Sequence, residues 1–99
     1  MQSKKLKEDL AKTLDEAEWS WLKPHAQRDA IVMVAQGLDL LVVAEAIALN
    51  SSTQVQDWIA QGLLSKPTQE QMDAWDQESG RKFMSLVVQP FVLIQDRFH

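Results

Sequence analysis

Residues 38–64, LDLLVVAEAIALNSSTQVQDWIAQGLL, contain two helical patterns separated by a short polar interruption. Asp39 is a favourable N-cap residue, and Leu38 before it can pack on Val43 as a hydrophobic staple. These signals predict a helix that runs through Leu49. Its inward face is apolar and consists of Leu40, Val43, Ala44 and Ile47.

The polar interruption leads into a second helix. Ser51 and Gln54 have the spacing of a capping box, in which each side chain bonds the backbone N–H of the other residue. We therefore expect a helix that ends near Gln61, with Gly62 where a C-terminal cap requires positive φ. Its apolar stripe consists of Val55, Trp58 and Ile59, and we expect Trp58 to be buried between the two helices.

The residues before this segment predict a helix followed by a strand. Apolar residues recur at helical steps, with Ser3 as the N-cap, at positions Leu6, Leu10, Leu14, Ala17 and Trp21. Pro24 disfavours helical geometry at the preceding residue, so this helix is expected to end near Leu22. The run AIVMV at residues 30–34 predicts a short buried strand, with a helix as the alternative for so short a run.

The residues after the segment predict a helix and then β-structure. Thr68 and Gln71 form a second capping box, so a brief helix carrying Met72 and Trp75 should end before Gly80. Residues 83–94 alternate as in a strand or a pair of strands, with a break, bulge or edge expected at the proline at position 90. The alternation places on one face Met84, Leu86, Val88, Val92 and Ile94.

This order of elements is that of a winged helix. It predicts one α+β domain over residues 1–99, with a helix-turn-helix at residues 38–64 packed on a two- or three-stranded sheet. The exit GLLSKP at residues 62–67 resembles that of the mercury-resistance-type regulators, with one extra residue in the turn around Ser51. The alternative is that any small α+β domain with two packed helices shows this spacing.

Composition narrows the classes of function. At 99 residues, with 45% hydrophobic and 24% charged residues, the chain is typical of one globular domain. With no cysteine it has no disulfide or thiolate metal site, and we expect no metal or cofactor. Neither a signal peptide nor a membrane-helix pattern is present, which predicts a cytoplasmic protein without membrane contact.

Two features bear on DNA binding. The net charge is −4, and a protein that grips nucleic acid normally carries a local excess of cations. The exposed positions of the second helix would read the bases, and they are Ser52, Thr53, Gln54, Gln56, Asp57 and Gln61. Glutamine can read adenine, but this set lacks the Arg or Lys that would pair guanine or hold phosphate. Five of these residues, from Thr53 to Gln61, instead form a candidate surface for a protein partner.

The first predicted helix offers a further candidate contact. Trp21 lies on its apolar stripe and is expected in the core. For Trp19 the alternatives are core packing, which is favoured, covering an edge of the domain, or contact with a partner. Because tryptophan is enriched among interface anchors, Trp19 is nevertheless included in the candidate interaction surface.

Catalytic signals are weak. His25, Arg28 and Asp29 lie within five residues and could act as a base with an orienting carboxylate, but no nucleophile is nearby. We interpret them as residues of a surface turn. Glu70 and Asp73 share a helical face, which we interpret as solvated rather than as a cation site. No common catalytic motif is present, so we do not expect an enzyme.

Three blocks of sequence resemble a known family. They are WSWLKPHAQRDA at residues 19–30, QVQDWI at 54–59 and VQPFVL at 88–93. Together they resemble an uncharacterised family of small bacterial proteins of about this length, a domain of unknown function with no established active site. The resemblance implies a stand-alone bacterial domain. We therefore predict a non-enzymatic cytoplasmic interaction module that binds an unidentified protein, with a DNA-binding helix-turn-helix regulator as the alternative.

Overall fold

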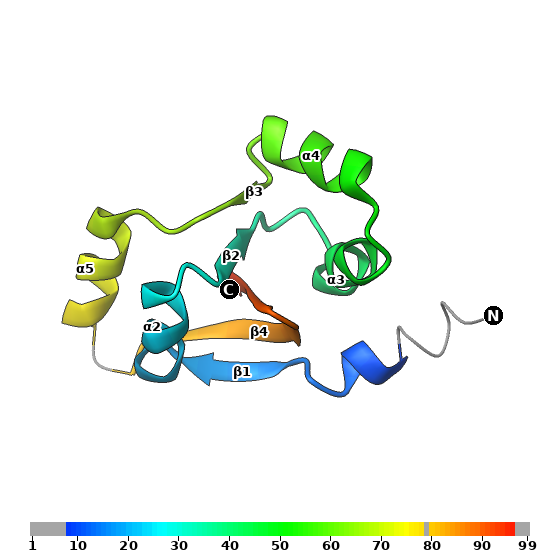
Figure 1. Ribbon diagram of the computed structural model, residues 1–99. Coiled ribbons are helices and arrows are strands. Elements are labelled where there is room, and N and C mark those ends of the chain that lie inside the picture. The colour runs from blue at the N-terminus through cyan, green and yellow to red at the C-terminus, as the bar shows by residue number, and fades with distance from the viewer. Residues whose placement is uncertain (1–7, 79, 97–99) are drawn as a thin grey trace.

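A five-stranded mixed sheet forms the centre of the molecule, in a computed structural model that describes residues 8–78 and 80–96 (Figure 1). The strands are β1 (Asp15–Glu18), β2 (Ile31–Val34), β3 (Leu64–Ser65), β4 (Lys82–Val88) and β5 (Phe91–Asp96). Their order across the sheet is β1-β4-β5-β2-β3. Strands β2 and β5 are parallel, and the other neighbours are antiparallel.

The sheet confirms one prediction and corrects another. The strand predicted at residues 30–34 forms as β2, and it pairs with β5, with Ile31 opposite Val92 and Met33 opposite Ile94. The expected sheet of two or three strands is too small, because β1 and β3 extend it on both sides. Both added strands are short and lie at the edges, where only one neighbour satisfies their backbone groups.

The single N-terminal helix predicted up to Leu22 is wrong. Residues 8–11 are helical, β1 follows, and α2 (Trp19–Gln27) begins directly after it; Ser3 and Leu6 lie outside the described residues. Strand β1 forms because it satisfies the edge of β4, where the hydroxyl of Ser85 also donates to the carbonyl of Asp15 at 3.1 Å.

Helix α2 also continues past the residue at which it was expected to end. Pro24 lies inside α2, so the helix lacks the hydrogen bond that this nitrogen would donate. Burial of Trp19 and Leu22 on the sheet offsets that loss. Tertiary packing therefore outweighs the local preference of the proline.

The two helices of the 38–64 segment form nearly as predicted. Helix α3 (Leu40–Ala48) begins at Asp39, whose carboxylate accepts the Leu41 N–H at 2.8 Å. Helix α4 (Ser52–Ala60) follows a three-residue turn, and Gly62 after it has the expected positive φ of 77°. The capping box expected from Ser51 is wrong, because the Ser51 side chain caps nothing.

The last helix and the terminal hairpin follow their sequence signals in part. Helix α5 (Gln69–Gln77) begins with the predicted capping box of Thr68 and Gln71. Strands β4 and β5 are the predicted pair of strands, broken at Gln89-Pro90, which has a cis peptide bond. We expected Val88 and Val92 to share a face, and this is wrong. Val88 pairs with Phe91 across the hairpin, so Phe91 shares the face of Val88 and Val92 lies on the opposite face.

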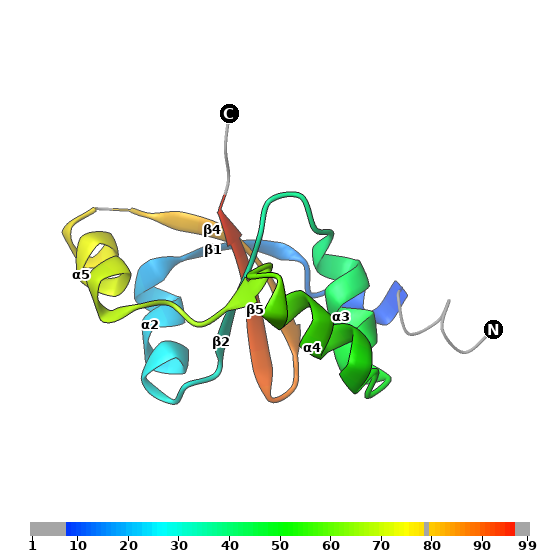
Figure 2. The same ribbon diagram turned by 90° about the horizontal axis from the view of Figure 1, so that it is seen from above.

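Helices cover both faces of the sheet (Figure 2). One cluster of buried residues joins α3 and α4 to Val34, Leu86 and Leu93. The other joins α2 and α5 to Ile31 and to further residues of β4 and β5. The α+β class is therefore confirmed as three layers, while the winged-helix arrangement is not. Trp58 is buried as predicted, at 7% exposure.

Candidate functional site

The structure confirms the favoured core position of Trp19 and corrects the expected core position of Trp21. Trp19, the candidate partner contact, is 4% exposed, and its Nε1 donates to Asp76 at 2.8 Å. Trp21, the expected core residue, is 52% exposed. The helix begins only at Trp19, so its inward stripe is Trp19, Leu22 and Ala26 rather than a continuation of residues 6–17. Trp19 therefore belongs to the core.

The other candidate contacts lie on α4 or at its C-cap and are exposed as expected. They are Thr53, Gln54, Gln56 and Asp57 on the helix and Gln61 at the C-cap. Trp19 lies in the layer on the opposite face of the sheet. The structure therefore does not bring the predicted interaction surface together as one patch.

A stripe along the exposed side of α2 is the clearest surface for a partner. Trp21, Pro24, His25 and Arg28 recur at helical spacing, and each is at least partly exposed. The rings of Trp21 and His25 have centroids 4.9 Å apart. Among the described residues, no carboxylate forms an ion pair with Arg28. We call these four residues the α2 stripe.

The candidate base and its carboxylate are not paired. Asp29 follows α2 with a positive φ of 63° and forms an ion pair with Lys66. His25 contacts the Trp21 ring instead, and the described side chains include no hydrogen bond between His25 and Asp29. The surface-turn interpretation holds for Arg28 and Asp29, which follow the helix, but is wrong for His25, which lies in the last turn of α2.

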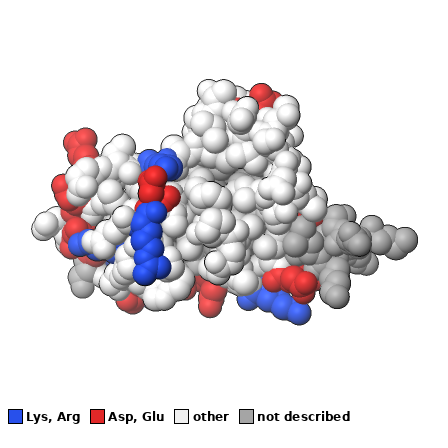
Figure 3. All heavy atoms as spheres, in the orientation of Figure 1, with Lys and Arg blue, Asp and Glu red and all other residues white. Residues whose placement is uncertain are grey.

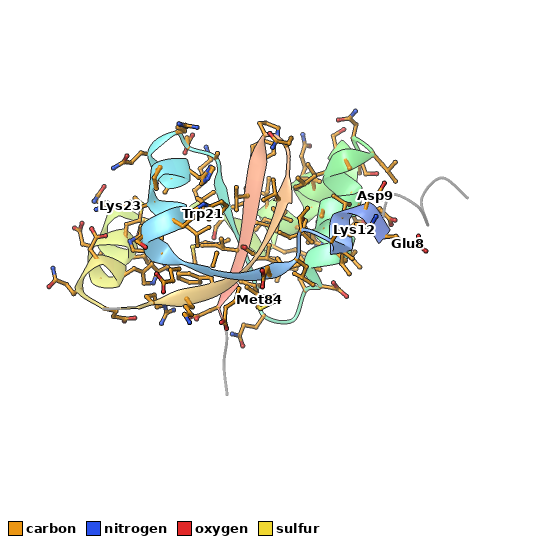
Figure 4. All side chains as sticks on the ribbon, turned by 90° about the horizontal axis from the view of Figure 1, so that it is seen from below. Glu8, Asp9, Lys12, Trp21, Lys23 and Met84 are labelled. Atoms are coloured by element: carbon orange, nitrogen blue, oxygen red, sulfur yellow. The ribbon has the colours of Figure 1, made fainter. Side chains whose placement is uncertain are left out.

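Asp76 connects the two helices of the α2–α5 layer. It accepts from Trp19 Nε1 and, at 3.1 Å, from Lys23 Nζ, which lies on the α5 side of α2 (Figure 4). These hydrogen bonds, that of Trp19 most strongly, hold the pKa of Asp76 below its usual value. Elsewhere on α5, Asp73 accepts from Gln69 at 2.9 Å, and the described part of the chain has no group of three acidic or histidine side chains placed to hold a metal ion.

An apolar cavity of about 510 Å³ lies between α4 and the sheet. Its apolar lining consists of Val32, Ala46, Ile47, Val55, Ile59, Leu64 and Phe91. Its polar lining consists of Asn50, Ser51, Ser52, Ser65 and Lys66. We call it the α4 cavity. Figure 3 shows that the described surface over α3 and α4 is almost entirely uncharged on this face.

Three basic residues that could hold phosphate already have partners: Lys66 lies beside the α4 cavity, whereas Arg81 and Lys82 lie at the start of β4, near the α2–α5 layer. Lys66 pairs with Asp29, and Lys82 lies 3.9 Å from Glu16. Arg81 pairs with Glu78 at 3.2 Å and with Asp96 at 2.7 Å. Within the described ranges, no helix is long and apolar enough to cross a membrane.

Comparison with known proteins supports the resemblance found in the sequence. None of the curated proteins matches the chain. A solution NMR structure of PA1075 from Pseudomonas aeruginosa is similar, with a TM-score of 0.79 and 31% sequence identity. The similarity covers 91% of this chain and 82% of that one. The family model described as "Protein of unknown function (DUF2288)" matches residues 5–96, and the chain belongs to this family.

Proposed function

We propose that the protein is a non-enzymatic protein-interaction module and that the α2 stripe is its contact surface. The exposure of Trp21 carries the proposal. The chain has four tryptophans, and the other three are at most 7% exposed. Tryptophan is enriched among the residues that dominate binding energy at protein interfaces, because one side chain buries a large area.

The charges along the stripe favour an acidic partner. Arg28 has no carboxylate partner among the described residues, whereas Lys66, Arg81 and Lys82 are all in ion pairs. Pro24 and His25 lie between Trp21 and Arg28 and carry no negative charge. The matching partner is an acidic protein segment with an apolar side chain that packs on the Trp21 ring.

A nucleic acid fits this surface less well. The stripe has one permanent cation, whereas a phosphate backbone requires several. Strand β1 next to α2 carries Asp15, Glu16 and Glu18, and the whole chain has a net charge of −4. A negative field beside the stripe repels a continuous polyanion more than a short acidic segment.

The test compares four forms of the protein against one partner. Proteins captured from an extract of the source cell are identified, and each is produced pure and titrated against wild type, Trp21→Ala, Arg28→Glu and Leu49→Ala. Leu49 is the matched control, because it is an exposed large apolar residue at 53% and lies in the other layer.

We expect Trp21→Ala to weaken the affinity for the partner at least tenfold. Arg28→Glu should weaken the affinity more at low salt than at high salt, and Leu49→Ala should leave it unchanged. Equal melting temperatures of the variants show that the fold is intact. Binding that is insensitive to Trp21, or Trp21-dependent binding to duplex nucleic acid, would overturn the proposal.

A further inference from the structure

Helix α4 leaves part of its apolar stripe uncovered. Of the three residues in that stripe, Trp58 is buried, Val55 is half-buried, and Ile59 is 55% exposed. Val55 and Ile59 both line the α4 cavity, which Val32 and Phe91 line from the sheet. The volume of about 510 Å³ lies within the range of about 300 to 1,000 Å³ typical of small-molecule sites.

The lining specifies an amphipathic ligand. Apolar side chains surround most of the cavity, and Lys66 is the only charged residue among the described residues that line it. No acidic side chain stands in that lining. A cation would therefore meet like charge, whereas an anion would meet an opposite charge at one end of an apolar slot.

The Lys66–Asp29 ion pair does not block such a ligand. The two side chains are 60% and 70% exposed, and a pair this accessible to water contributes little to stability. An anionic head group can replace the Asp29 carboxylate at Lys66 without leaving a buried charge behind. The Asp29 side chain then returns to water.

We infer that the α4 cavity binds the acyl chain of an amphipathic anion, with the head group at Lys66. The inference goes beyond the proposed function, because the cavity and the α2 stripe lie in different helical layers. A free fatty acid and the acyl chain of an anionic phospholipid share this chemistry. The test distinguishes these two sources.

The first measurement titrates the full chain with octanoate, decanoate and dodecanoate by calorimetry, below their micelle-forming concentrations. Each added methylene should tighten binding about fourfold, or about fifteenfold for each pair of methylenes. Dodecanol should bind more weakly than dodecanoate, because it lacks the charge that Lys66 recognises. Affinity that does not change with chain length would overturn the inference.

Variants then test the two ends of the site. Val55→Phe fills the cavity and should reduce the affinity for dodecanoate at least tenfold. If Val55→Phe melts below wild type, Ile59→Phe serves as the second variant, with the same expected result.

At the charged end, Lys66→Met should weaken the binding of dodecanoate but not of dodecanol. Asp29→Asn should strengthen dodecanoate, and asparagine tolerates the positive φ found there. Dodecanoate binding that is unchanged in both phenylalanine variants or in Lys66→Met contradicts the site.

Sedimentation with phosphatidylglycerol vesicles shows whether the bound acyl chain belongs to a free fatty acid or to a phospholipid. Dodecanoate binding without vesicle binding identifies the free acid, and vesicle binding that Val55→Phe abolishes identifies the phospholipid. Binding of neither probe overturns the inference. Trp21→Ala should bind dodecanoate like wild type. The proposal for the cavity and the proposal for the α2 stripe can therefore be tested independently.

Discussion

The two helical layers pack on the same sheet by different means. In the α2–α5 layer, Trp19 and Trp75 meet edge to face at 4.9 Å, and Trp75 meets Phe83 at 4.8 Å. Hydrogen bonds from Trp19 and Lys23 to one carboxylate connect the helices. The α3–α4 layer is mainly aliphatic and leaves a cavity of about 510 Å³. Aromatic rings with directional contacts therefore fill the α2–α5 layer, whereas the smaller side chains of the α3–α4 layer leave a cavity.

This contrast suggests a division of roles. A closely packed layer holds a surface anchor such as Trp21 in a fixed orientation, which lowers the entropy lost on binding. An incompletely packed layer has room for a ligand. If the packing of the two layers differs in this way, matched substitutions in the two layers should change stability differently.

The largest expected effect is the loss of a buried tryptophan from either layer. Trp75→Ala and Trp58→Ala should each lower the free energy of unfolding by about 3 to 5 kcal/mol, because each side chain is 7% exposed. Trp75→Ala should cost about 1 kcal/mol more, since Trp75 also loses two edge-to-face ring contacts. Urea unfolding measures both values. A larger loss for Trp58→Ala would contradict the proposed difference between the layers.

Enlarging one half-buried alanine in each layer should give opposite results. Ala46→Leu extends into the α4 cavity and should raise the free energy of unfolding by about 0.5 to 2 kcal/mol. Ala26→Leu meets the aromatic cluster and should lower it by about 1 to 3 kcal/mol through overpacking. The same urea titration checks both variants. Two changes of the same sign would show that the layers are equally well filled.

Local sequence signals predicted much of the α3–α4 layer and of α5. The caps at Asp39, Thr68 and Gly62 depend on residues within one turn of the helix, so a local pattern can predict them, although the same kind of pattern at Ser51 did not form a cap. Strand β1 was missed because its formation depends on pairing with β4, a segment more than sixty residues later. Its sequence, DEAE, has no strand propensity of its own.

The candidate site was harder to predict than the elements that carry it. Which of Trp19 and Trp21 faces outward depends on where α2 begins, and a missed strand shifted that start. The cavity had no sequence signal, because Val55, Ile59 and Phe91 have the pattern of ordinary core residues. A cavity arises from the difference between the space enclosed and the side-chain volume that fills it, and neither quantity can be read from periodicity.

Lowering the pH should have a smaller effect on the free energy of unfolding, through Asp76 in the α2–α5 layer. The folded-state pKa of Asp76 lies below its unfolded value, so the unfolded chain binds the proton first as the pH falls. The stabilisation is complete above the ordinary aspartate pKa of about 3.9 and is lost as the pH falls through the lower folded value. Asp76→Asn should therefore flatten the acid limb of stability against pH. Parallel acid limbs for wild type and variant would show that Asp76 is not coupled to folding.

The smallest expected effect is any binding of DNA by the α3–α4 layer. Each phosphate contact contributes about 0.9 to the slope of log affinity against log salt, so even Lys66, Arg81 and Lys82 together allow a slope of at most about three, and only Lys66 of these lies beside α4. Each of these side chains is already paired with a carboxylate, and the exposed face of α4 presents Asp57 without any lysine or arginine. We therefore expect no retention on heparin at physiological salt and no duplex affinity tighter than about 10 μM. Fluorescence anisotropy against a library of duplexes at that salt provides the measurement. Sub-micromolar, sequence-selective binding that Gln56→Ala abolishes would instead make α4 a recognition helix, and it would make the α3–α4 layer, rather than the α2 stripe, the surface through which the protein acts.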